Sequence, residues 1–145
     1  MFYKFKPKCT RTHMPKIPSA LGILGILGFL GFTGFIPMEY NGETIPTFFF
    51  FFGFFGWFGF YYHGKMSGTF IDERLKFNES RASSTTYKIA FAFMLMASVC
   101  VITAMNGLQF PTHIALAILI AAAGLSVALV GFFAPYLLYK YENEE

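Results

Sequence analysis

The sequence has few charges for its length, and the charges it has are kept out of its longest apolar stretches. Charged residues make up 13% of the 145 residues, about half of the share usual in a soluble domain, while hydrophobic residues make up 55%. A soluble domain could not cover this much apolar surface with so few charges. The composition therefore favours an integral membrane protein.

Cysteines and clustered metal ligands are also scarce. Cys9 and Cys100 share no spacing typical of a disulfide framework or a zinc site, and the three histidines stand far apart. No phosphate-binding loop or catalytic triad has a sequence signature. No Asp or Glu lies inside an apolar stretch, where ion-coupled transporters and small four-span exporters keep one. We expect no enzymatic activity, no catalytic residue, no metal site and no cofactor.

Apolar runs are what the sequence has in abundance, and there are four of them. A helix needs about 20 apolar residues to cross the hydrocarbon core, within a range of roughly 17 to 25. The third and fourth runs meet this length, whereas the first two are short, so a re-entrant hairpin is the alternative to two full spans. We predict an all-α integral membrane four-helix bundle of two helical hairpins. Its spans are expected at residues 20–36, 47–62, 87–105 and 114–139.

Lysine and arginine alternate between the segments that join these runs. The first tail carries five, the segment between the second and third runs carries five if Lys88 is included, and the last tail carries one. The other two loops carry none. Because cytoplasmic segments are enriched in Lys and Arg, both termini are expected in the cytoplasm. We expect a multi-pass protein of the inner cell membrane. It comprises a basic tail (1–17), a membrane domain (18–139) with a cytoplasmic loop (63–86), and an acidic tail (140–145).

Small residues recur at fixed spacing inside the runs. In the first two runs glycine stands at every third position: Gly22, Gly25, Gly28, Gly31 and Gly34, then Gly53, Gly56 and Gly59. On an α-helix such a row drifts by about 60° per step and forms a spiral groove. We expect phenylalanines of the second run to fit into this groove, because small residues let helices approach closely in lipid.

A second small-residue pattern follows the heptad period. Its members are Ser83, Ala90, Ala97 and Ala104 in and before the third run, and Ala117, Ala121, Gly124, Ala128, Gly131 and Pro135 in the fourth. This pattern predicts a seam that packs the third and fourth spans together.

The chemically dense stretch is residues 64–88. Thr69 and Asp72 have capping-box spacing, and Asp72 and Lys76 have the spacing of an ion pair on a helix. A charged helix is predicted to begin near Phe70 and to continue into the third span. A solvated loop that only sets topology is the alternative to a docking surface. The candidate residues for binding a cytosolic partner are Asp72, Glu73, Arg74, Lys76, Asn78 and Arg81.

From "LGILGILGFLGF" to "HGKMSGTFIDERLKFNESRASSTTYKIAF" the chain resembles a family of small bacterial membrane proteins of unknown function. The resemblance covers residues 18–105 and includes a "DER" motif followed by Asn78. It implies a Gly/Leu/Phe first span, a Phe-rich second span and no established activity. It also implies a link to small helix-turn-helix regulators, whose genes often lie near those of such proteins.

These observations favour a non-enzymatic sensor or tether that binds a cytosolic partner, such as a small transcriptional regulator, through residues 64–88. A self-immunity protein against a membrane-active peptide and an accessory subunit of an export complex are the alternatives. The lipid bilayer and a second copy of the chain are further candidate partners. Nucleic acid is disfavoured, because the basic tail "KFKPKCTRTHMPK" has no folded reader beside it.

Overall fold

The computed structural model describes residues 13–36, 39–40, 43–44, 46–108 and 111–144. The chain forms the 3₁₀ helices η1 (Ser19–Phe35) and η2 (Pro46–Phe58), and the α-helices α1 (Gly59–Lys65), α2 (Glu73–Leu108) and α3 (Thr112–Glu144). A two-residue antiparallel pairing joins β1 (Glu39–Tyr40) to β2 (Glu43–Thr44) between the 3₁₀ helices. The all-helical prediction is confirmed.

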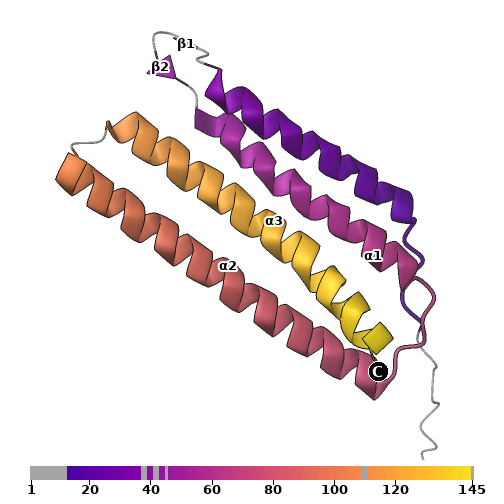
Figure 1. Cartoon of the computed structure of the whole chain (residues 1–145). Coiled ribbons are helices and arrows are strands. Elements are labelled where there is room, and N and C mark those ends of the chain that lie inside the picture. Colours follow the sequence, from indigo (N-terminus) through magenta and orange to yellow (C-terminus); the bar gives the residue numbers. More distant parts are fainter. Residues whose placement is uncertain (1–12, 37–38, 41–42, 45, 109–110, 145) are drawn as a thin grey trace, which may run out of the picture.

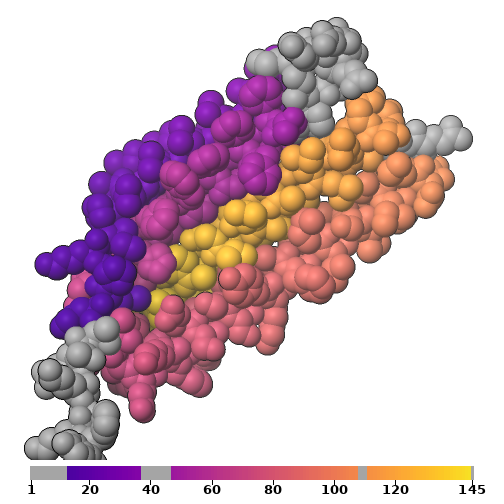
Figure 2. Space-filling view, turned by 180° about the vertical axis from the view of Figure 1, so that it is seen from behind, coloured from indigo at the N-terminus to yellow at the C-terminus, as the bar shows by residue number. Residues whose placement is uncertain are grey.

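The helices lie side by side in one layer, in the order η1, η2 with α1, α3 and α2 (Figure 1). The same order is seen from the opposite side in Figure 2. Each helix packs on its neighbours in the layer, so the expected bundle is replaced by an open row. Two helices, α2 and α3, are long and apolar enough to cross a membrane, and η1 is a shorter apolar helix.

The first run and most of the second, up to Phe58, are 3₁₀ helices, where the sequence predicts α-helices. A 3₁₀ helix has three residues per turn, so residues three apart lie directly above one another. The glycine row of η1 is therefore a straight column and not a drifting groove. The Ile36 amide, which donates to the Thr33 carbonyl at 3.0 Å, and the Thr33 hydroxyl, which donates to the Leu30 carbonyl, both show this three-residue step.

A column of rings on η2 fits against the glycine column of η1. A Cβ atom built on Gly28 would lie 2.5 Å from the ring of Phe55, and one on Gly25 would lie 2.6 Å from the ring of Phe58. Each step of three residues along η1 is matched by a step of three back along η2 and the first turn of α1, where Tyr61 lies. The successive pairs are Gly22 with Tyr61, Gly25 with Phe58, Gly28 with Phe55, Gly31 with Phe52, and Gly34 with Phe49.

Aromatic rings stack along the 3₁₀ helices at the repeat of the backbone. The centroids of Phe52 and Phe55 are 6.1 Å apart, and those of Phe55 and Phe58 are 6.3 Å apart, with nearly parallel planes. Three residues of a 3₁₀ helix rise about 6 Å, so side chains that eclipse each other are at the right distance to stack. Between the helices, Phe32 meets Phe52 edge to face at 5.1 Å. Ring contacts of this kind stabilise a conformation that is uncommon beyond a single turn.

A second face of η2, continued by Gly59 of α1, is a glycine column that packs on α3. A Cβ on Gly56 would lie 3.1 Å from the Cα of Ala128 and 3.2 Å from the Cα of Gly131. A Cβ on Gly59 would collide with the Gly131 carbonyl oxygen. In an α-helix the Gly131 carbonyl would accept a hydrogen bond from the amide of residue 135. Pro135 has no amide hydrogen, so this oxygen lacks that partner, and the Cα–H of Gly59 faces it instead.

The heptad seam therefore differs from its prediction. Gly124, Ala128 and Gly131 of α3 face η2, not α2. On α2, Ala90 is buried and Ala97 and Ala104 are half-buried, while Ser83, Ala117 and Ala121 are also half-buried. The seam is not one continuous interface, because α3 lies between η2 and α2. The smallest residues of α3 pack against the glycine column of η2.

The charged helix predicted within the connecting segment 63–86 is present. α2 begins at Glu73, three residues after the predicted start, and continues without interruption through the third apolar run. The expected acidic tail is also helical, because α3 extends to Glu144. Hydroxyl groups in the apolar runs donate to carbonyls of their own helix, as in Ser98 to Met94 at 2.9 Å.

The glycine column makes a prediction about stability. Gly28→Ala is expected to lower the free energy of unfolding by about 1–3 kcal/mol, because the added methyl group overlaps the ring of Phe55. Gly107→Ala is the matched control, since a Cβ there meets nothing within 4 Å. Because alanine has a higher helix propensity than glycine, the control variant should leave the free energy of unfolding unchanged or raise it slightly. Thermal unfolding in detergent measures both variants, and equal effects would contradict the packing of η1 on η2.

Candidate functional site

The candidate site is one end of the layer, which we call the basic end. The start of α2, the end of α3, the α1 terminus and the N-terminal segment at residues 13–18 meet there (Figure 1). Most lysines and arginines of the described chain gather at this end, namely Lys16, Lys65, Arg74, Lys76, Arg81 and Lys140, whereas Lys88 lies about 22 Å from the start of α2. The opposite end carries β1 and β2, whose charged residues are Glu39 and Glu43.

A small hydrophobic core holds the basic end together. Met66, Leu75, Ala82 and Leu138 are at most 5% exposed and are in contact with one another. The residues come from the turn after α1, from α2 and from α3, so the core fixes these elements relative to one another. Half-buried side chains of Met14 and Ile71 pack against it. The basic end is thus a folded unit.

The N-terminal segment is paired with the turn before α2. The Met14 amide donates to the Thr69 carbonyl at 3.0 Å, and the Ile17 amide donates to the Ser67 hydroxyl at 3.1 Å. Gly68 has a φ of 82°, a left-handed conformation that suits glycine and turns the chain toward α2. This pairing places the basic N-terminal segment beside the charged start of α2.

The start of α2 is capped by Asp72. Its Oδ1 accepts a hydrogen bond from the Leu75 amide at 2.8 Å, so Asp72 is the N-cap of α2 and does not take the N3 position of a capping box begun by Thr69. The expected ion pair with Lys76 is not formed among the described residues, because the carboxylate is directed to the helix terminus. Its negative charge also suits the positive end of the helix dipole.

Asn78 joins α2 to α3 and is not a surface residue. Its side chain is 4% exposed, and its Nδ2 donates to the Glu142 carboxylate at 2.7 Å. One turn further, the Arg81 guanidinium lies 4.7 Å from the centre of the Tyr141 ring. The sequence predicts Asn78 as a partner contact, but its buried side chain and its hydrogen bond to Glu142 give it a role in packing the two helices.

The other predicted partner-binding residues are exposed. They are Asp72, Glu73, Arg74, Lys76 and Arg81. Sequence reasoning missed Phe77, which is 68% exposed among these charges although it is a large apolar side chain. The signal was available: on a helix that buries Leu75 and Asn78, Phe77 falls on the opposite face. Exposed aromatic residues beside arginines are frequent at protein interfaces.

Lys65 is held over two rings at this end. Its Nζ lies 4.6 Å from the centre of the Tyr61 ring and 5.4 Å from that of Tyr139. A hydrogen bond with Tyr61 is the main reason why the pKa of Lys65 is raised. The described residues contain no group of three or more His, Cys, Asp and Glu side chains that could hold a metal ion.

Comparison with protein-family models matches residues 17–141 to the family described as "Predicted membrane protein (DUF2178)". The chain belongs to this family. This family membership supports the expectation of a membrane protein, and the match covers both 3₁₀ helices, α1, α2 and most of α3. No curated protein and no solved structure matches the chain.

His63, at the end of α1, gives a prediction about protonation. Burial lowers the pKa of His63 below the usual value of about 6.5, and the Glu79 carboxylate partly opposes this shift. The unfolded chain takes up the proton near pH 6.5 while the folded protein resists it. Stability is therefore greatest above that pH and decreases as the pH falls toward the pKa of the folded state.

NMR titration of the His63 ring in micelles measures this pKa. Glu79→Gln is expected to lower it further, because the variant removes a negative charge that favours the imidazolium. Glu144→Gln is the control and should leave the value unchanged. A pKa at or above 6.5 in the unmodified protein would show that burial does not dominate.

Proposed function

We propose that the protein is a non-enzymatic, multi-pass protein of the inner membrane, with both termini in the cytoplasm. The support comes first from helix lengths. A 3₁₀ helix rises about 2.0 Å per residue, so the 17 residues of η1 extend about 34 Å, enough for a hydrocarbon core of about 30 Å. The 13 residues of η2 and residues 59–62 of α1, where the second apolar run ends, together extend about 32 Å. Short apolar runs are then long enough to span.

The excess length of α2 supports a cytoplasmic projection. Its 36 residues extend about 54 Å, of which the apolar residues 89–108 account for about 30 Å. The charged first part, residues 73–88, extends a further 24 Å or so beyond the hydrocarbon core. Residues 136–144 of α3 accompany it. The lysines and arginines near this end support the proposed orientation of the protein in the membrane, because segments rich in these residues are retained on the cytoplasmic side.

Cysteine labelling tests this orientation. Lys76→Cys should react only after cells are opened, and Glu43→Cys should react with an impermeant maleimide on intact cells. Cys9→Ser and Cys100→Ser remove the native thiols from the background, and their own effect on expression is measured first. Labelling of both positions from the same side would contradict the proposed topology.

The projecting part of α2 is the proposed docking surface for a cytosolic protein, of which a small transcriptional regulator is the leading candidate. The observation that supports it is the exposed ring of Phe77, flanked by Arg74 on one side and Lys76 on the other. A partner with an apolar pocket and an acidic rim would complement this surface. The core of the basic end presents the surface in a fixed shape, which reduces the entropy lost on binding.

Site-specific photocrosslinking tests the docking surface. A photoreactive phenylalanine analogue at position 77 is expected to form one discrete adduct with a soluble protein in living cells. Arg81→Glu should abolish the adduct, whereas Ser84→Ala on the same helix should not. The same analogue at position 91, in the apolar part of α2, is the second control. No adduct at position 77, or an adduct unaffected by Arg81→Glu, would refute docking at this surface. An adduct of twice the chain mass would indicate a second copy as the partner.

A further inference from the structure

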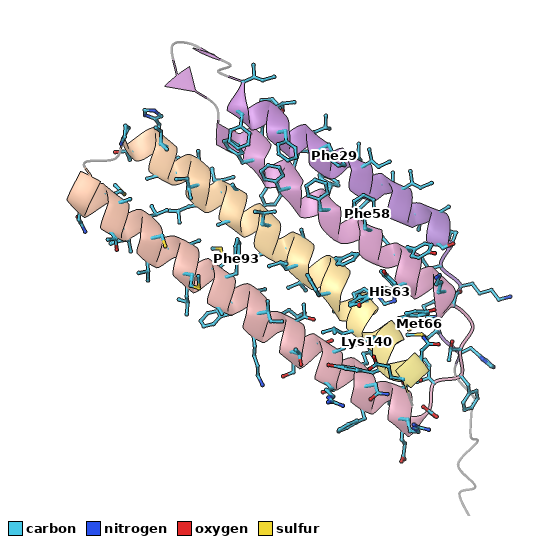
Figure 3. All side chains as sticks on the ribbon, in the orientation of Figure 1. Phe29, Phe58, His63, Met66, Phe93 and Lys140 are labelled. Atoms are coloured by element: carbon cyan, nitrogen blue, oxygen red, sulfur yellow. The ribbon has the colours of Figure 1, made fainter. Side chains whose placement is uncertain are left out.

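An apolar groove lies between η2, α3 and α2. Its volume is about 500 Å³, within the range of pockets that hold small ligands. Phe93 projects from α2 into the space beside α3 (Figure 3). The other principal lining residues are Phe55 and Phe58 of η2 and Leu125, Leu129 and Phe132 of α3.

The lining restricts the kind of occupant. The groove surface is almost wholly apolar, so an extended peptide would bring amide and carbonyl groups into a site with no partners for them. A hydrocarbon chain has no such groups. The groove is an open depression and not an enclosed cavity, as a chain that enters sideways from a bilayer requires.

Aromatic contacts lead from the groove to a cation at the basic end. The ring centroids of Phe132, in the groove wall, and Tyr62 are 5.8 Å apart, and those of Tyr62 and Tyr139 are 5.6 Å apart. The ammonium of Lys65 lies over Tyr139. The order is therefore hydrocarbon groove, tyrosine layer and positive charge, which is the order of acyl chain, interface and headgroup in an anionic lipid.

We propose that this groove and Lys65 together bind one anionic phospholipid, with an acyl chain along Phe93 and Leu129 and the headgroup phosphate at the Lys65 ammonium. The site is separate from the docking surface around Phe77, and it does not depend on whether a cytosolic protein binds there. Its occupant complements both features: the groove excludes water and polar chains, and the cation selects negative charge.

Spin-labelled lipids test the site in the full-length protein reconstituted in phosphatidylcholine vesicles. The probes are phosphatidylglycerol and phosphatidylcholine, each with a nitroxide on the acyl chain. The immobilised fraction in the electron paramagnetic resonance spectrum should be larger for phosphatidylglycerol. Lys65→Gln is expected to reduce this preference about five-fold, as the loss of one interfacial charge implies. Lys76→Gln, which removes a charge from the same end but away from the groove, should retain it.

A second pair of variants tests the groove itself. Leu129→Trp fills the groove and should reduce immobilisation of both probes, whereas Leu95→Trp, on the exposed face of α2, should not. Thermal unfolding verifies that both variants fold. If Leu129→Trp does not fold, Leu125→Phe takes its place. Equal immobilisation of the two probes in the unmodified protein would overturn the proposal. So would an equal loss in Lys65→Gln and Lys76→Gln, or a second copy of the chain that covers the groove and excludes both probes.

Discussion

The structure depends on direct contact between a column of glycines on η1 and a column of aromatic rings on η2. Gly25, Gly28 and Gly31 have no side chain to separate the backbone from the rings of Phe58, Phe55 and Phe52. This contact is continuous only if both helices repeat every three residues, which is the 3₁₀ repeat and not the α repeat. The sequence spacing and the backbone conformation therefore require each other. A 3₁₀ helix of 17 residues is uncommon, and here ring stacking along η2 and close approach of η1 offset its poorer hydrogen-bond geometry.

The same repeat explains the layered arrangement. With three residues per turn, η2 has three separate faces: one of rings toward η1, one of glycines toward α3, and one of rings from Phe48 to Trp57. Two close interfaces on different faces of one helix place its neighbours apart, so the helices form a row. α3 then has η2 on one side and α2 on the other. The apolar groove lies where Phe93 of α2, the rings of η2 and the larger side chains of α3 leave space between them.

The basic end is stabilised differently from the rest of the chain. It has a buried core around Leu75 and a hydrogen bond from the buried Asn78 side chain to the half-buried Glu142, which are features of water-soluble folds. The membrane part has exposed leucines and phenylalanines, as lipid allows. The two proposed sites lie on either side of this change: the docking surface around Phe77 beyond the hydrocarbon core, and the lipid site where Lys65 meets the tyrosine layer. Both use cations that the chain keeps at one end.

The sequence by itself determined the all-helical character, the apolar runs, the charge difference between the two ends and the continuity of the charged segment with the third run. These follow from composition and local spacing, because hydropathy and charge act residue by residue. Capping by Asp72 in place of Thr69, burial of Asn78 and the partner of the Gly124–Ala128–Gly131 row were decided by the tertiary structure. Each depends on which neighbour lies beside a residue, and periodicity along one helix does not specify that neighbour. The 3₁₀ conformation depends on both the sequence and the tertiary structure. Its three-residue spacing is visible in the sequence, but an isolated chain gains nothing from it until a ring column lies opposite the glycines, and only the packed pair supplies that contact.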